Sequence, residues 1–323
     1  MRRRVLLPLV TLAATAGLAL AGAAAIDHGE SSATTRPGFG AGPVQPGTPR
    51  TDGWAAVVDF DARIDPGSRN ACERGGPACL SSVVDEMAAR LELQGCTHTA
   101  PFAFTYLEMT RGVERAVGEP AFFDDPPSTV HADALFARLY FDAFDNWAAG
   151  RLDEVPGVWR IAFETAARAD TNAATDLLLG MNAHISRDLP YVVADVAAWQ
   201  GSGGRGDFER VNQVIARVKR PMLREAAERF DPSLALLDLP LPALAASDSA
   251  ELIATWRNQA LDRGLRLARA DSGPERAAIE GEIERSALAT AVLLLNAGTV
   301  TQGPVPPAAR DAYCEAATAQ PGP

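Results

Sequence analysis

The sequence has few basic residues. Lys219 is its single lysine, and 30 lysines and arginines stand against 41 aspartates and glutamates, for a formal net charge of −11. Proteins that bind nucleic acid or anionic membranes through charge carry an excess of basic residues. The acidic balance therefore argues against nucleic acid as a partner.

Long apolar runs are missing after residue 25. A membrane-spanning helix needs about 20 apolar residues, and the run at Leu293–Leu295 belongs to a much shorter apolar stretch. The N-terminal run follows arginines 2–4 and contains several A-x-A sites up to Ala25. This pattern is typical of a secretory signal peptide. We predict that residues 1–25 form one and that the protein is exported, without further membrane contact; an uncleaved anchor is the alternative.

Cysteine is scarce, and no C-x-x-C spacing is present, which argues against a structural zinc site made of cysteines. Cys72, Cys79, Cys96 and Cys314 are an even set in a chain bound for an oxidising compartment, where disulfides form. Of the three possible pairings we favour Cys72–Cys79, across a loop rich in glycine and proline, with Cys96–Cys314. The second bond would tie the C-terminal tail to the body.

Sustained alternation of apolar and polar residues, the sign of strands, is also missing. Residues 26–53 are rich in Gly, Pro, Ser and Thr and are predicted to be a disordered linker, while residues 54–60 form a short strand or an extended lead-in. Beyond them the apolar spacing is helical. The predicted helices are 82–94, 101–117, 128–149, 156–169, 171–199 with a bend at Pro190, 207–230 with a bend at Pro221, 248–270 and 274–298. We predict an all-α, single-domain multi-helix array over residues 54–316, with disulfide-tied ends and a tail at 317–323.

Histidine is also scarce: after His28 in the linker only His98, His131 and His184 remain. His184 lies in the apolar stretch Gly180–Pro190, four residues before Asp188. Residues four apart share one face of a helix, and polar groups buried in an apolar helix need a partner or a ligand. This pair is the first candidate site.

A second helix carries a similar pair. His131 and Asp142 are eleven residues apart, close to three turns, and thus share a face. If the two helices pack together, four side chains would suit Zn²⁺ or another divalent transition metal such as iron or manganese: His131, Asp142, His184 and Asp188. His98 is a fifth ligand or a supporting residue, and Asp145 is the candidate catalytic base. The resulting hypothesis is a metal-dependent hydrolase of esters or phosphodiesters.

The competing hypothesis is a structural network in a protein that binds a small molecule or a partner. Arg138 would pair with Asp142, Asp188 would accept a hydrogen bond from His184, and Asn182 would bridge helices. Gly180 would allow a neighbouring helix or a substrate to come close. We place this hypothesis first, because a lone H-x-x-x-D helix is less specific than H-E-x-x-H.

Other motifs are absent or lack their context. Residues 201–206 match G-x-G-x-x-G, but the segment before them is helical, whereas the dinucleotide fingerprint follows a strand. The sequence has no G-x-S-x-G nucleophile elbow and no P-loop.

Several stretches together resemble the domain of unknown function 5995 family. They are residues 122–126, 141–147, 159–163 and, most specifically, 178–190, with Val211-Asn212 further along. The resemblance covers about residues 54–300 and implies a mainly helical protein of G+C-rich bacteria with no assigned activity. A helical H-x-x-x-D pair is also similar to that of zinc-dependent phospholipases C, but this chain has too few histidines for a trinuclear site.

Overall fold

The structure, a computed structural model, describes residues 60, 62–200, 204–241, 244–298 and 305–319. The chain divides into two units, Met1–Gly40 and Ala41–Pro323, and all described residues belong to the second, which is treated by itself. The predicted signal peptide, the predicted linker and nearly all of residues 54–60 lie outside the described residues. Within the described part, no helix is long and apolar enough to cross a membrane.

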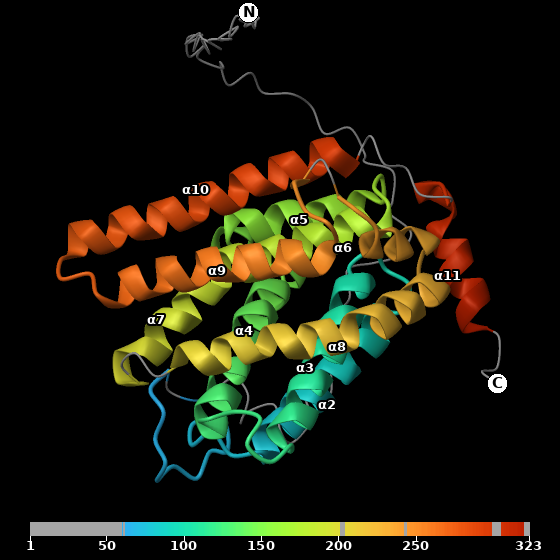
Figure 1. Cartoon of the computed structure of the whole chain (residues 1–323). Coiled ribbons are helices and arrows are strands. Elements are labelled where there is room, and N and C mark those ends of the chain that lie inside the picture. The colour runs from blue at the N-terminus through green and yellow to red at the C-terminus, as the bar shows by residue number, and fades with distance from the viewer. Residues whose placement is uncertain (1–59, 61, 201–203, 242–243, 299–304, 320–323) are drawn as a thin grey trace, which may run out of the picture. The chain divides into compact units, whose positions relative to one another are not determined.

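The described residues form ten α-helices and no strand, apart from one isolated bridge between Leu241 and Ala246. The α-helices are α2 (Ala78–Gln94), α3 (Ala100–Val117), α4 (Pro126–Ala148), α5 (Gly157–Arg168), α6 (Ala173–Asn182), α7 (Leu189–Gln200), α8 (Arg205–Arg229), α9 (Ser249–Ala268), α10 (Gly273–Gly298) and α11 (Arg310–Thr318). Shorter turns are η1 (Leu152–Glu154), η2 (Ala183–Asp188), η4 (Pro232–Asp238) and η6 (Pro307–Ala309). The all-α prediction is confirmed (Figure 1).

Helix starts follow local capping chemistry. The predicted cap Asp248 accepts from the amide of Ala250 at 2.8 Å and starts α9 as expected. Helix α4 begins earlier than predicted, at Pro126, because Asp125 accepts from the Ser128 amide at 3.2 Å. A side-chain oxygen at the N-cap satisfies a backbone N–H that has no partner in the helix, so these short bonds decide where each helix begins.

The long helix predicted over 171–199 is interrupted by η2, a π-turn. The N–H of Leu189 bonds to the carbonyl of His184, five residues back. Pro190 explains the wider turn, because proline has no N–H for the carbonyl four residues earlier and its ring collides with that carbonyl in a regular α-helix. The proline is thus accommodated by a local change of hydrogen bonding, and the chain continues as α7.

The core centres on aromatic residues from α3, α4 and α5. The ring of Phe102 lies 5.1 Å from that of Tyr140 and 5.5 Å from that of Trp159, edge to face in both cases. All three side chains are buried. A Cβ on Gly180 would lie 2.7 Å from the Phe102 ring, so only glycine lets α6 approach α3 so closely. Of the two neighbours predicted for Gly180, a helix or a substrate, the helix is the one found at this position.

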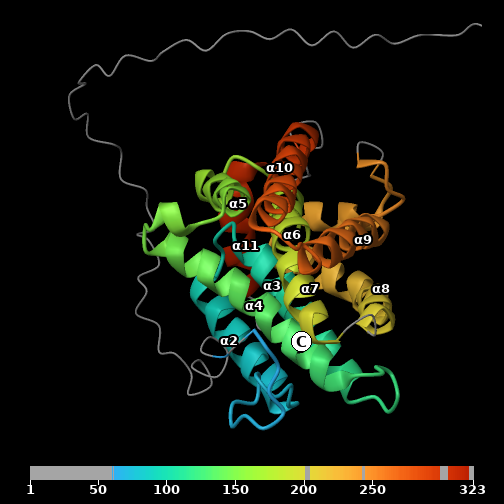
Figure 2. The same cartoon turned by 90° about the vertical axis from the view of Figure 1, so that its left-hand side faces the viewer.

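Helices α9 and α10 form a long hairpin, as Figure 1 shows. Helix α7 packs against α9 over much of its length. At their contact a Cβ on Gly264 would lie 2.5 Å from Cβ of Val193 and 2.6 Å from the carbonyl of Pro190. Figure 2 shows α7, α8 and α9 as neighbours, next to α4. These four helices provide most of the lining of the cavity described below.

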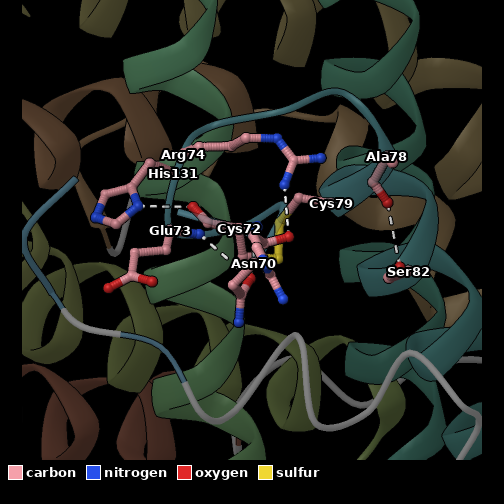
Figure 3. Close-up of a disulfide and its surroundings, with 9 residues drawn as sticks. Asn70, Cys72, Glu73, Arg74, Ala78, Cys79, Ser82 and His131 are labelled. Atoms are coloured by element: carbon pink, nitrogen blue, oxygen red, sulfur yellow. Dashed lines mark hydrogen bonds between the residues drawn. A yellow bond between two sulfur atoms is a disulfide. The ribbon is translucent and has the colours of Figure 1, made fainter. Parts of the chain in front are cut away.

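Both predicted disulfides are present, Cys72–Cys79 and Cys96–Cys314. The first closes a short loop before α2, in which Asn70 Oδ1 accepts from the Cys72 amide at 2.8 Å (Figure 3). The second joins the segment after α2 to α11, a helix that the sequence did not predict as such.

Helix α11 is held by a buried charge as well as by its disulfide. Arg310 donates to Asp176 Oδ2 at 2.5 Å and to the Thr171 carbonyl at 2.9 Å. Its Nε lies 3.3 Å from Asp231 Oδ2. A buried guanidinium is stable only when carboxylates and other acceptors surround it. Arg310 therefore joins α11 to the start of α6 and to the residue that caps η4.

Candidate functional site

The predicted pair of His184 and Asp188 does form, inside η2. His184 Nδ1 lies 3.3 Å from Asp188 Oδ2, and the same oxygen accepts from Trp159 Nε1 at 2.8 Å. Both members of the pair are buried, at 3% and 0% exposure. Asp188 thus holds a histidine and a tryptophan from two different elements, as the network hypothesis predicts.

The other oxygen of Asp188 meets a cation. Arg187 Nη1 donates to Asp188 Oδ1 at 2.9 Å, while its Nε donates to Glu284 Oε1 of α10 at 2.8 Å. The two carboxylates raise the pKa of Arg187 despite burial, which acts in the opposite direction. The buried carboxylate of Asp188 therefore has Arg187 as its counter-ion. The hydrogen bond from Arg187 to Glu284 links η2 to α10.

The imidazole of His184 lies in an aromatic cage. Its ring stacks on Phe136 at 3.4 Å and lies 4.4 Å from the Tyr106 ring. Burial lowers the pKa of His184, although the hydrogen bond to Asp188 acts in the opposite direction. Nε2 is buried without a hydrogen-bond partner among the described residues, and so is the Tyr106 hydroxyl. The cage thus holds an oriented imidazole, disfavours its charged form, and leaves one ring nitrogen without a partner among the described residues.

His131 lies in a different environment. Its Nδ1 lies 2.8 Å from the carbonyl of Cys72 (Figure 3), and its Nε2 lies 2.8 Å from the carbonyl of Ala62. The side chain is fully buried. Both ring nitrogens are therefore engaged with the main chain that precedes α2, and His131 anchors that segment to α4.

The remaining predicted site residues lie apart. Asp142 is exposed, Asp145 receives two hydrogen bonds from Arg90 at 2.6 and 2.9 Å, and His98 lies between Arg310 and Asp311. Eleven residues rise about 16 Å along a helix, so His131 and Asp142 share a face but cannot reach one ion. No group of three His, Cys, Asp or Glu side chains that could hold a metal occurs among the described residues.

Two further motif residues have clear partners. Asn182 Nδ2 donates to the carbonyl of Ala287 at 2.8 Å, and this hydrogen bond bridges α6 to α10. Asn212 Oδ1 accepts from Arg257 Nε at 2.7 Å, and the Phe208 carbonyl accepts from Arg257 Nη2 at 2.8 Å. Asn212 therefore fixes the orientation of a buried arginine.

That arginine faces a partly open cavity of about 600 Å³ lined mainly by α4, α7, α8 and α9. Apolar side chains form most of its wall, chiefly Phe136, Leu189, Val192, Val193, Val196, Phe208, Val211, Leu261 and Leu265. Small-molecule sites have this size and character, with a few polar groups that fix orientation. This cavity, which none of the histidines lines, is a concave feature that a ligand can fill.

Two charged residues that line the cavity, Asp133 and Arg257, do not form an ion pair with each other. Asp133 Oδ2 is buried and makes no hydrogen bond with any described residue. Burial raises the pKa of Asp133 to about 7, because it outweighs the attraction of Arg257. Burial likewise lowers the pKa of Arg257 to about 10, against the attraction of Asp133. Perturbed groups that line a cavity are the usual mark of a functional site.

Motif residues converge on this cavity. Leu189 of the Gly180–Pro190 stretch and Val211 line it, Asn212 holds Arg257, and Phe136, which stacks on His184, is part of its wall.

The model of the Family of unknown function (DUF5995) matches residues 80–297. The chain belongs to this family. No curated protein and no solved structure matches it. The family match begins later than the resemblance suggested and covers every helix that lines the cavity.

Sequence reasoning missed Asp133 and Arg257. Asp133 stands between two alanines next to Leu135, and Arg257 follows Trp256, so each is a charge within an apolar helical stretch. This is the signal that drew attention to His184 and Asp188. Applied to every charged residue, it would have indicated both.

Proposed function

We propose that this protein binds a small, mostly apolar molecule in the cavity between α4, α7, α8 and α9. One observation carries the proposal: a cavity of about 600 Å³ is lined by Asp133, whose buried Oδ2 has no hydrogen bond with the described residues, and by Arg257, whose Nε donates to Asn212. Burying such groups without partners costs free energy. A ligand that fills the cavity and satisfies them would recover part of that cost.

In this proposal the His184–Asp188 pair supports the cavity. Phe136 contacts the imidazole and lines the cavity, and Leu189 follows Asp188 directly in the wall. The network of Asp188 with Trp159 and Arg187 fixes η2 against α5 and α10. Its role is to hold the position of the wall.

Export is also part of the proposal. The arginines and apolar run of residues 1–25, with four cysteines paired in two disulfides, support an extracytoplasmic location. Disulfides persist in oxidising compartments.

The alternative, a metal-dependent hydrolase with Asp145 as base, stays a prediction. The Nε2 of His184, which has no hydrogen-bond partner among the described residues, would be available as a ligand atom, whereas both nitrogens of His131 are engaged with carbonyls. Metal content of the full chain, purified without chelator or affinity histidines, tests it. Near-stoichiometric metal that disappears in His184→Ala would support the hydrolase.

Binding is tested with a neutral apolar fluorophore, Nile red, and a matched pair of variants. Val196 lines the cavity, whereas Val292 is 53% exposed on α10. We expect saturable binding with enhanced fluorescence in the full chain and in Val292→Trp. Val196→Trp, which places a large ring in the cavity, should lose it while keeping its helical circular dichroism. Equal binding by the two variants would contradict the proposal.

A further inference from the structure

The polar groups of the cavity indicate the head group of its ligand. Arg257 Nε and Nη2 donate hydrogen bonds to Asn212 and Phe208 of α8, and Nη1 makes no hydrogen bond with the described residues. Among the described residues, no carboxylate lies within ion-pair distance of this guanidinium, and the Arg257 side chain is buried, at 6% exposure. A buried cation without a counter-ion is unfavourable, and arginine binds carboxylates in a planar, two-bonded geometry. The missing partner is an anion.

The other charged residues that line the cavity also favour an anionic ligand. Asp207 lies in the wall, but its carboxylate already accepts from the amides of Asp124 and Asp125, at 2.8 and 2.7 Å, and it pairs with Arg210. Arg205 and Arg269 also line the cavity. Arg205 lies 3.7 Å from Glu209, with which it forms an exposed ion pair. Apart from Asp133, the charged lining groups without an ion pair among the described residues are therefore Arg257 and Arg269, and both are cationic.

Resting on the proposed function, we propose that the ligand is an apolar monocarboxylic acid, with its carboxylate on Arg257 and a hydrogen bond from the protonated carboxyl of Asp133. The apolar chain would lie along the valines of α7 and the leucines of α9. An amine would meet Arg257 unfavourably, and an alcohol would leave the guanidinium without a counter-ion. A buried guanidinium in an apolar wall thus selects an amphiphilic anion.

Asp133 makes this binding dependent on pH. The charged or titratable groups around it are Arg257 and Arg269 of α9, Arg205 and Asp207 of α8, and the Tyr106 hydroxyl of α3; α7 contributes only apolar residues. A protonated Asp133 donates to the ligand carboxylate, whereas an ionised one repels it. Because burial raises the pKa of Asp133 to about 7, affinity should fall as pH rises through neutrality.

The experiment compares three ligands with the same alkyl chain: decanoate, decanol and decylamine. Their affinities for the full chain are measured by calorimetry below and above neutral pH. We expect decanoate to bind about tenfold more tightly than decanol below neutral pH, as for one charge-assisted hydrogen-bonded pair, and decylamine to bind most weakly. Decanol or decylamine binding as tightly as decanoate would overturn the carboxylate assignment while leaving the cavity proposal intact. If none of the three binds, both proposals fail.

Two variants test the residues. Arg257→Met should abolish the preference for decanoate, while Arg266→Met, on α9 but outside the cavity wall, should keep it. Asp133→Asn should bind decanoate with an affinity that no longer changes through neutral pH. Because Asp133→Asn keeps the shape of the side chain, it tests the inference even if Arg257→Met fails to fold. An unchanged pH dependence in Asp133→Asn would overturn the role of Asp133.

Discussion

Replacing Asp188 by alanine removes the common acceptor of three buried donors. Trp159 Nε1, Arg187 Nη1 and His184 Nδ1 lie 2.8, 2.9 and 3.3 Å from its oxygens. The carboxyl has no exposed surface, so water cannot replace it without rearrangement. Arg187 retains Glu284, whereas the tryptophan and histidine N–H groups are left without an acceptor.

The expected cost follows from these contacts. A buried donor left unsatisfied costs about 1–3 kcal/mol, and breaking a buried charge pair costs about 3–5 kcal/mol in total. We therefore expect Asp188→Ala to lower the free energy of unfolding by about 3–5 kcal/mol. Asp188→Asn keeps one acceptor oxygen for Trp159 and should lose about 1–3 kcal/mol.

His184→Phe is the informative comparison. It preserves a ring against Phe136 and removes both the long 3.3 Å hydrogen bond and the unpartnered Nε2. We expect a change within about 1 kcal/mol, because removing an unsatisfied buried nitrogen offsets the lost bond. Urea unfolding of the oxidised protein, followed by circular dichroism and tryptophan fluorescence, gives all three values. If His184→Phe loses as much as Asp188→Ala, the assignment of Asp188 as the central acceptor is wrong.

Three further changes have expected outcomes. Gly180→Ala brings a Cβ within 2.7 Å of an aromatic ring of α3 and should cost about 1–3 kcal/mol in urea unfolding; an unchanged midpoint would contradict the close contact. Replacing Cys96 and Cys314 together by alanine should cost about 5 kcal/mol, because 218 residues separate them, and an undiminished stability would contradict that estimate. Wild-type stability should fall by roughly 2–4 kcal/mol between about pH 4 and pH 7 through Asp133. Its folded-state pKa, about 7, lies above the ordinary 3.8, so the folded protein holds the proton longer than the unfolded chain does; in Asp133→Asn this contribution should vanish.

Much of the fold was predictable because its causes are local. Apolar spacing located every helix from α2 to α10, and Asp248 bonds to amides two and three residues away. The π-helical turn itself could not be predicted from the sequence. Pro190 indicates a bend, but both a widened turn and a kink can accommodate a proline.

The candidate site was less predictable, because its partners are distant in sequence or belong to the main chain. His131 bonds to two carbonyls, which no residue pattern reveals. The cavity wall consists of valines, leucines and phenylalanines that look like ordinary core residues in the sequence. Only packing decides whether such side chains meet or leave a space, so Asp133 and Arg257 gained their significance from the structure.

The π-turn also sets the rotational phase of α7. The hydrogen bond from Leu189 to His184 spans five residues, one more than in an α-helix. One residue corresponds to about 100° of rotation about the helix axis. Deleting a single residue of η2 would restore a regular helix and turn Val192 and Val193 away from α9 and the cavity. Members of the family that keep the cavity should therefore keep the length of this segment, and a one-residue gap here would mark members whose wall has been rebuilt.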